Sequence, residues 1–369
     1  MANEELKLPV YVKVTIILIG LFAFFTLLYI ARDIIIPVVF STILAILLHP
    51  VVNFFVRLKM NRVVAITVTL LLTFLLMLGF GALLISQANK LSESWPILVE
   101  KFTVLLNQNI NDAADYFNKD PQKIHEWFTK TQGELINTST VALGQTLVIV
   151  GSGLIILFLL PVYIFLILFY QPLLLEFIHR LFGIENKSRV SEIVSQIKGL
   201  IQQYLAGLLI EAVMVAILDA AALFILGIEY ALILGIIGAL LNMIPYLGGL
   251  VAVAMPMMVA IVTKSSPIYA IYVLIAYYFI QLIDNNYIVP YIVASKVKIN
   301  ALFSIIVVIA GNALWGIPGM FLSIPILAIV KLVCDHIEPL TPWGFLLGDT
   351  MPPILEIKKI LKKIKIIKE

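Results

Sequence analysis

Long apolar runs separated by polar segments dominate the first part of the chain. The runs cover residues 14–31, 34–55, 63–85, 146–170 and 204–227. Each approaches the roughly 20 residues that a helix needs to cross about 30 Å of hydrocarbon. The first run has no small-residue cleavage site and is followed at once by another, so we expect a retained span and not a signal peptide. The pattern predicts a bundle of transmembrane helices.

Beyond residue 227 the apolar runs are shorter and are interrupted by proline and glycine. Pro245, Gly248 and Gly249 interrupt one run, and a break between Gly316 and Pro325 interrupts another. In hydrocarbon, irregular backbone is tolerated only where protein or trapped water satisfies its polar groups. A proline kink with close glycine packing is the alternative explanation. Two such segments, each with an amide nearby, favour a polar cavity. We therefore expect an all-α, polytopic integral membrane protein of about eight spans, with broken or re-entrant segments in its C-terminal half.

Three polar or amphipathic segments complete the pattern. Residues 87–144 are polar and mildly acidic, and Leu91 and Leu98 within them recur at helical spacing, which predicts a helical insert outside the membrane. This insert is either a lid over a pore or a solvated connection between spans. Residues 187–203 carry one apolar stripe, typical of a helix that lies on the membrane surface before turning in. The lysine-rich tail, 354–369, should rest on an anionic inner leaflet.

These features divide the chain into five predicted regions. They are N-terminal transmembrane helices (1–86), an extracytoplasmic helical insert (87–144), a fourth span with a cytoplasmic amphipathic helix (145–203), a transport core with broken helices (204–345) and a basic amphipathic cytoplasmic tail (346–369).

Composition agrees with a membrane protein. Of 369 residues, 62% are hydrophobic and 13% are charged, and the mean hydropathy is +1.06, which is too apolar for a soluble domain. The single cysteine, Cys334, excludes an intrachain disulfide and a multi-cysteine metal site. Basic residues gather at 57–62, at 180–198 and in the tail. Because short loops rich in Lys and Arg face the cytoplasm, we expect both termini to be cytoplasmic. An isoleucine-rich basic tail favours lipid, so no nucleic acid is expected.

Two acids lie within an apolar run. Glu211 and Asp219 stand two helical turns apart on one broad face. Ionisable groups at membrane depth are costly and usually face a cavity or a partner. They are candidates for coupling to protons or cations. Alternatively, they are protonated carboxyls that bond a neighbouring helix.

Polar residues also gather beside the interrupted segments. Gln281, Asp284, Asn285 and Asn286 end one apolar run and form either an interfacial stop or one wall of a polar site. The complete predicted substrate-binding set is Asn242, Pro245, Tyr246, Gly248, Gly249, Gln281, Asp284, Asn285, Asn286 and Asn312. By contrast, Asp33, His49, Lys331 and His336 lie near span ends, where we expect them to act as interfacial anchors.

Motifs of common enzymes and channels are absent. The chain has no GxxxxGK[ST] phosphate loop, no HExxH pair, no GxSxG elbow and no TVGYG filter. We therefore expect a protein that is not an enzyme, uses no cofactor or metal and draws transport energy from a gradient or a partner.

Three motifs carry a family resemblance. They resemble signature regions of the autoinducer-2 exporter family, the PerM-like permeases. The motifs are IPYLGG from Ile244, the D-x-x-x-x-x-P stretch from Asp284 and the G-x-x-G-x-x-x-x-x-P stretch from Gly316. The chain departs from the family pattern with Leu208 after Gly207 and with Gly249 in place of a second proline.

The resemblance implies a transporter in the bacterial inner (plasma) membrane. Its leading function would be secondary export of a small polar solute such as autoinducer-2, coupled to protons or sodium. The alternatives are a sodium(lithium)/proton antiporter and a membrane scaffold protein. The resemblance further implies a homo-oligomer, with a pentamer favoured.

Overall fold

The computed structural model of the protein describes residues 9–117, 159–183, 186–243, 248–264, 266–293 and 298–350. Helices make up nearly all of this part, and its one β contact is an isolated bridge between Ile299 and Gly348. Six helices in it are long and apolar enough to cross a membrane, or seven if one bent pair counts as a span. The predicted all-α, polytopic membrane fold is confirmed. The predicted count of about eight spans remains approximate, because length and composition alone define these helices.

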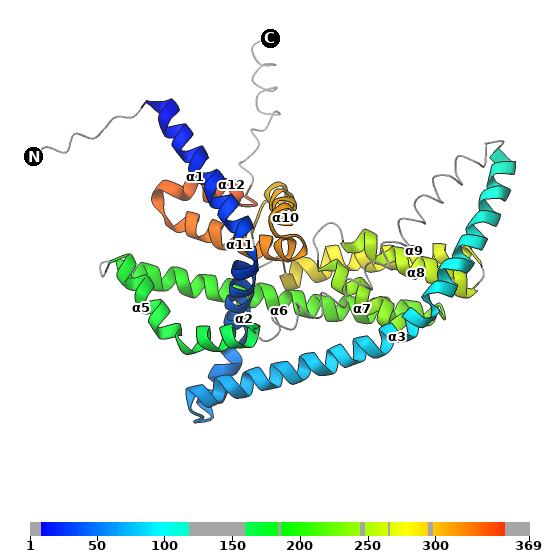
Figure 1. Ribbon diagram of the computed structural model, residues 1–369, viewed down its shortest axis with the longest axis horizontal. Coiled ribbons are helices and arrows are strands. Elements are labelled where there is room, and N and C mark those ends of the chain that lie inside the picture. The colour runs from blue at the N-terminus through cyan, green and yellow to red at the C-terminus, as the bar shows by residue number, and fades with distance from the viewer. Residues whose placement is uncertain are drawn as a thin grey trace, which may run out of the picture.

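Three helices form the N-terminal part. α1 spans Val10–Ile30, α2 spans Arg32–Arg57 and α3 spans Arg62–Phe117. In Figure 1, α3 and α6 run along the long axis of the molecule, while α1 and α2 cross them. α1 has no buried residue, and the indole N–H of Trp315 reaches the carbonyl of Leu28 on it at 3.1 Å.

α3 extends well beyond its membrane-spanning part. The third apolar run and the start of the polar insert form one helix of 56 residues, roughly twice the length that a span requires. The expected helix is therefore confirmed as far as Phe117. The rest of the insert lies outside the described residues, and the choice between a lid and a connection stays a prediction.

The helix expected to turn at Tyr204 is instead continuous. α6 runs from Lys187 to Ile225 over 39 residues, so the predicted surface helix and the following span form one unbroken helix. The predicted turn is absent, since both Gly199 and Gly207 lie inside the helix. Positive-φ glycines occur at Gly183, Gly227 and Gly316, at helix ends. Before α6, the helix Leu159–Phe169 bends by 62° into α5 (Gln171–Leu181).

Shorter helices make up the C-terminal half. These are α7 (Ala231–Asn242), α8 (Gly248–Lys264), α9 (Ile268–Ile283), the π-helix η2 (Asp284–Val293), α10 (Ala301–Trp315), α11 (Ile317–His336), the 3₁₀ turn η4 (Glu338–Leu340) and α12 (Thr341–Leu347). α7 has 12 residues and α10 has 15, fewer than a span requires. The expected interruption of the C-terminal runs is thus present.

A glycine contact closes the hairpin of α10 and α11. Gly316 makes the turn with φ 65° and ψ −143°, a conformation that favours glycine. A Cβ at Gly311 would clash with the carbonyl of Gly319, and a Cβ at Gly319 would clash with the carbonyl of Gly311. Pro325 is buried inside α11 without ending it.

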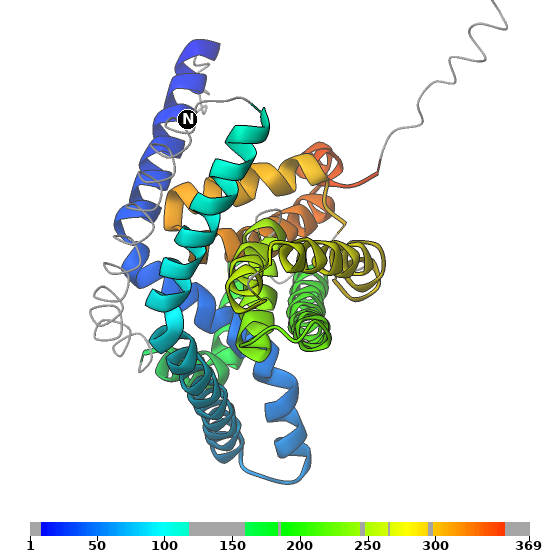
Figure 2. The same cartoon turned by 90° about the vertical axis from the view of Figure 1, so that its right-hand side faces the viewer.

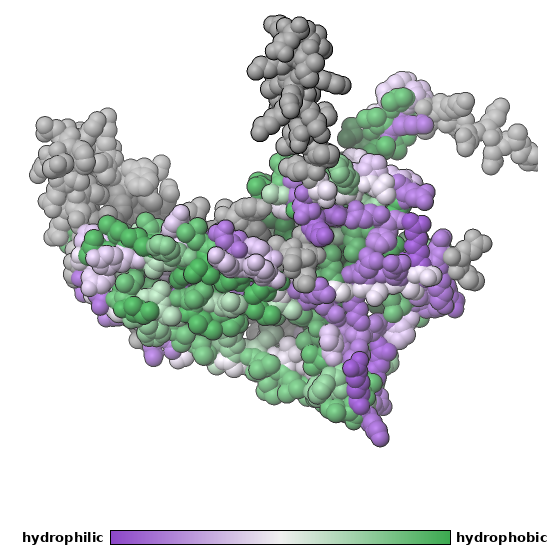
Figure 3. All heavy atoms as spheres, turned by 180° about the vertical axis from the view of Figure 1, so that it is seen from behind, coloured by the Kyte–Doolittle hydropathy of each residue, from purple (hydrophilic) through white to green (hydrophobic). Residues whose placement is uncertain are grey.

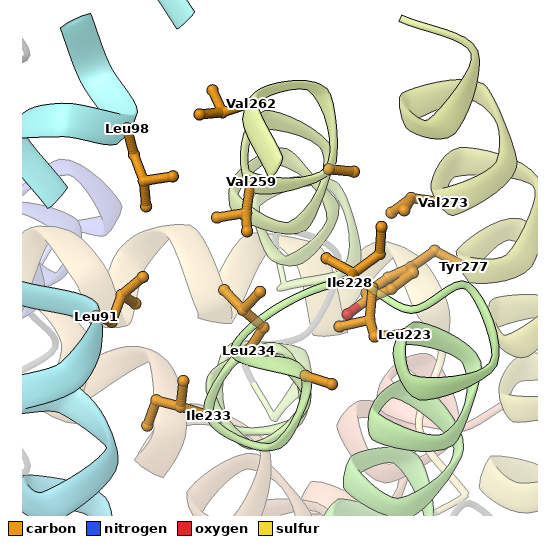
Figure 4. Packing of buried hydrophobic residues seen from close by; sticks show 12 residues of the cluster. Leu91, Leu98, Leu223, Ile228, Ile233, Leu234, Val259, Val262, Val273 and Tyr277 are labelled. Carbon is orange, nitrogen blue, oxygen red and sulfur yellow. The ribbon is translucent and has the colours of Figure 1, made fainter. Parts of the chain in front are cut away.

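The largest buried cluster joins α3 to α6, α7, α8 and α9. Figure 4 shows Leu91 and Leu98 of α3 facing Leu234 of α7 and Val259 of α8. The hydroxyl of Tyr230 donates to Ser94 Oγ at 2.7 Å. Figure 2 views the molecule from this end, where the short helices lie beside α3 and α6. The start of the polar insert therefore packs against the C-terminal half.

Apolar and polar surfaces separate along the molecule. In Figure 3, hydrophobic residues cover much of one end, and hydrophilic residues gather toward the end that carries α5. At that end Arg189 donates to the carbonyl of His336, and Arg62 donates to the carbonyl of Leu168 at 2.8 Å. Lys198 Nζ lies 3.4 Å from His49 Nε2 and Arg62 also acts on His49, so one residue of each basic segment lies near His49.

Candidate functional site

Three carboxyl groups are buried together where α6, α7, α9 and η2 meet. Glu211 and Asp219 of α6 are 5% and 3% exposed, and Asp284, the first residue of η2, is 1% exposed. Asp284 interacts electrostatically with both of the α6 acids. We call these three residues the acid cluster. The predicted pair on α6 therefore points inward, and a third acid from a distant part of the sequence joins it.

Small residues on α7 bring that helix against the acids. A Cβ added to Gly238 would lie 2.9 Å from Asp219 Oδ2, and a Cβ added to Gly235 would lie 2.7 Å from the backbone nitrogen of Ala220. Both positions are helical, so the need for glycine comes from close approach and not from backbone conformation. α7 ends at Asn242, which places an amide beside Asp284.

Two amides donate hydrogen bonds to Asp284. Asn242 Nδ2 lies 2.8 Å from Asp284 Oδ2, and Gln281 Nε2 lies 3.3 Å from the same oxygen. Asp284 Oδ1 is buried and has no hydrogen-bond partner among the described residues. A buried oxygen with unused acceptor capacity is costly unless water, an ion or a solute meets it. The amides orient the carboxyl and leave one oxygen for such a partner.

Two buried tyrosines flank the acid cluster, and the sequence reasoning missed both. Tyr277 is 8% exposed, interacts electrostatically with Asp219, and its hydroxyl has no hydrogen-bond partner in the described part of the chain. Tyr204 is 5% exposed and interacts electrostatically with Glu211. Spacing could have found them. Tyr277 precedes Gln281 by four residues, and Tyr204 precedes Glu211 by two turns.

A π-helix begins within the polar stretch that follows Gln281. α9 passes directly into η2, which keeps the chain helical from Ile268 to Val293 despite Pro290. π-helical segments are rare and occur frequently at functional sites. The wider turn starts at Asp284, the most buried acid of the cluster.

Of the remaining predicted site residues, Asn285 contacts the group around Asp284, since its Oδ1 accepts from Gln281 Nε2 at 3.5 Å. Asn285 and Asn286 are exposed, and Asn286 donates to the carbonyl of Leu282 at 2.8 Å. Asn312 is exposed on α10, which packs chiefly on α11 and α1. Gly248 and Gly249 are the first residues of α8. Pro245 and Tyr246 lie outside the described residues.

The acids of the cluster have no cationic partner among the described residues. Salt bridges within the described ranges involve Asp33, Glu176 and Asp335, and none involves an acid of the cluster. No three His, Cys, Asp or Glu side chains in those ranges converge in a way that could hold a metal ion. Buried carboxyls without a cationic partner can hold a proton, a single cation or a hydroxyl-bearing solute.

Comparisons with known proteins agree on one family. The family model described as AI-2E family transporter matches residues 16–338. The chain is 24% identical over 316 residues to YrrI of Bacillus subtilis, described as a candidate transport protein, covering 83% of this chain and 87% of YrrI. It is 22% identical over 320 residues to the AI-2 transport protein TqsA of Escherichia coli, covering 83% and 87%. It is also 22% identical over 250 residues to PerM of Escherichia coli, described as a candidate permease, covering 66% of each.

Proposed function

The chain belongs to the AI-2E family of transporters, and from this premise we propose that it is a secondary transporter that exports a small polar solute such as autoinducer-2. It is a multi-pass protein of the bacterial plasma membrane. The proposal adds the kind of solute, the direction and the energy source. It also includes cytoplasmic termini and a homo-oligomer, with a pentamer favoured.

One observation supports the proposal most strongly. Asp284 is 1% exposed, two amides hold one of its oxygens, and the other oxygen has no hydrogen-bond partner among the described residues. A small hydroxylated solute offers O–H groups that a carboxyl and a free amide oxygen accept. Asn242, Gln281 and Asp284 are therefore the proposed solute contacts. Pro245, Tyr246, Gly248 and Gly249 follow Asn242 in the chain and remain proposed neighbours of this site.

Glu211 and Asp219 are the proposed coupling groups. They lie on the helix beside Asp284, so a change in charge on either acid alters the electrostatic field at the solute contacts. Proton exchange at these carboxyls would then be linked to binding and release of the solute.

The same observation favours a second candidate, a sodium(lithium)/proton antiporter. In that case the acid cluster is the transport site itself, and protons and a small cation alternate on its carboxyls. Support comes from the lack of a salt-bridge partner for these acids in the described ranges. A membrane scaffold, the remaining alternative, needs no buried acids.

Flux through proteoliposomes tests the proposal. The purified full-length chain is reconstituted and given autoinducer-2, other small polar solutes, sodium or lithium, under an imposed proton or sodium gradient. Gradient-driven movement of a polar solute supports the exporter. Cation movement in exchange for protons, without solute flux, supports the antiporter. No flux of either kind, in vesicles that contain folded protein, would contradict both.

A further inference from the structure

A second polar site lies at the basic end of the molecule, away from the acid cluster. Helices α2 and α3 and the bend before α5 enclose a half-open cavity of about 120 Å³. Its polar lining consists of His49, Asn53, Arg62 and Gln171, and no acidic residue lines it. At about 30 Å³ for each water molecule of the liquid, this volume holds a few waters or one group of phosphate size. We call it the basic cavity.

Two cations, Lys198 and Arg62, lie near His49, and neither takes part in a salt bridge among the described residues. Lys198 Nζ of α6 lies 3.4 Å from His49 Nε2, and His49 interacts electrostatically with both Lys198 and Arg62. Lys198 and His49 are only partly exposed. An ammonium can only donate, so His49 Nε2 accepts from Lys198 and the imidazole is neutral, which leaves Lys198 and Arg62 as the positive charges beside the cavity. The arrangement therefore favours a bound anion.

Arg62 is positioned and still has free donors. Both of its hydrogen bonds come from Nη2, to the carbonyl of Leu168 at 2.8 Å and to Gln171 Oε1 at 3.1 Å. Its Nε and Nη1 hydrogens have no bond to any described residue, and a guanidinium suits bidentate binding of phosphate. Gln171 also bonds His49, so one network orients the lining.

Two helix N-termini point to the same ligand chemistry. α3 begins at Arg62 and α5 begins at Gln171, and both residues line the basic cavity. The helix dipole at such ends favours anions, although Asn61 Oδ1 already accepts from the Val63 N–H of α3 and Pro172 of α5 has no N–H. They add to the cations of the cavity and do not act alone.

We infer that the basic cavity binds a phosphate group, supplied by the headgroup of an anionic phospholipid. The span α2 ends at Arg57, and the span α3 begins at Arg62. The cavity therefore lies at the level of lipid headgroups. Val52, Val56 and Leu168 give it an apolar wall that suits the glycerol and upper acyl region of a lipid. A soluble phosphate has the same charge but gains nothing from that wall.

Native mass spectrometry of the full-length chain in detergent tests the inference. Dioleoylphosphatidylglycerol, dioleoylphosphatidylcholine and inorganic phosphate are the three probes. We expect retained phosphatidylglycerol adducts, several-fold fewer adducts with Arg62→Gln, and little effect of Arg57→Gln. Arg57 carries the same charge as Arg62 and is likewise exposed, but it does not line the cavity. Arg57→Gln therefore measures how far the loss of one positive charge alone weakens the attraction for anions.

A second variant separates binding from folding. Val56→Trp fills the mouth of the basic cavity while it leaves Arg62 and its bond to Leu168 intact, so adducts should fall although helix content and gel-filtration profile are unchanged. Arg62-dependent adducts of inorganic phosphate, without phosphatidylglycerol adducts, would overturn the lipid source in favour of a soluble phosphate. Equal loss with Arg57→Gln and Arg62→Gln, or equal retention of phosphatidylcholine, would overturn the site.

Discussion

Asn242 at the end of α7 donates a hydrogen bond of 2.8 Å to Asp284, 42 residues further along the chain. This bond fixes the carboxyl at the start of η2 and leaves Asp284 Oδ1 without a partner in the described ranges. The end of α7 and the start of η2 thus meet in one polar contact.

The first prediction concerns Asn242. Asn242→Ala removes a hydrogen bond to a carboxyl, a loss of about 1.5–3 kcal/mol, which corresponds to roughly a tenfold or greater drop in solute flux if the bond is needed in the transport step. Asn312→Ala is the matched control, because Asn312 is an exposed amide beside the other broken segment. Flux through proteoliposomes is the measurement. Equal losses for the two variants would show that Asn242 has no special role.

These two asparagines also show how far the sequence could lead. Both stand beside interrupted apolar runs, and nothing in local sequence separates them. Only packing places Asn242 against Asp284 and leaves Asn312 exposed on α10. By contrast, apolar length predicted the spans, and the cost of charge at membrane depth predicted that Glu211 and Asp219 face inward.

Other features were hidden for different physical reasons. Residues 187–203 have a surface-helix pattern, but a change in amphipathicity does not break hydrogen bonds along a helix, so α6 continues. The contact of Gly238 with Asp219 depends on two helices that meet only in the fold. The π-helix η2 has no simple sequence signal, and it contains Pro290 without ending.

The second prediction concerns Tyr277. Its buried hydroxyl has no hydrogen-bond partner among the described residues, so Tyr277→Phe removes an uncompensated polar group and should leave thermal stability in detergent equal or slightly higher. If the hydroxyl meets the solute or a proton near Asp219, flux should fall several-fold in the same variant. Tyr278→Phe, at an exposed neighbouring position, is the control. A clear loss of stability with unchanged flux would mean that the hydroxyl is purely structural.

The third prediction concerns the glycine contact of the α10–α11 hairpin. Gly319→Ala places a methyl group against the backbone of Gly311 and should cost about 1–3 kcal/mol through overpacking. Gly79→Ala on α3 meets nothing within 4 Å and should be neutral or slightly stabilising, because alanine favours helix more than glycine does. Thermal unfolding in detergent measures both. Equal melting temperatures for the two variants would rule out close packing of the hairpin.

The fourth prediction distinguishes the possible functions. Glu211→Gln combined with Asp219→Asn keeps the shape of both side chains and removes their ability to ionise. An antiporter should lose exchange, because two of the three carboxyls of its transport site can no longer ionise. A coupled exporter should keep binding of its solute through Asn242, Gln281 and Asp284 but lose most gradient-driven flux. A scaffold should assemble as before.

The matched control is Glu229→Gln, which neutralises an exposed acid at the turn between α6 and α7. It should leave flux and assembly unchanged. Solute flux and cation flux are measured on the same vesicles, and gel filtration reports assembly. Full gradient-driven flux in the double variant would exclude Glu211 and Asp219 as coupling groups. The burial of these two acids would then be explained by bonding between α6 and its neighbours, the structural alternative that their sequence position left open.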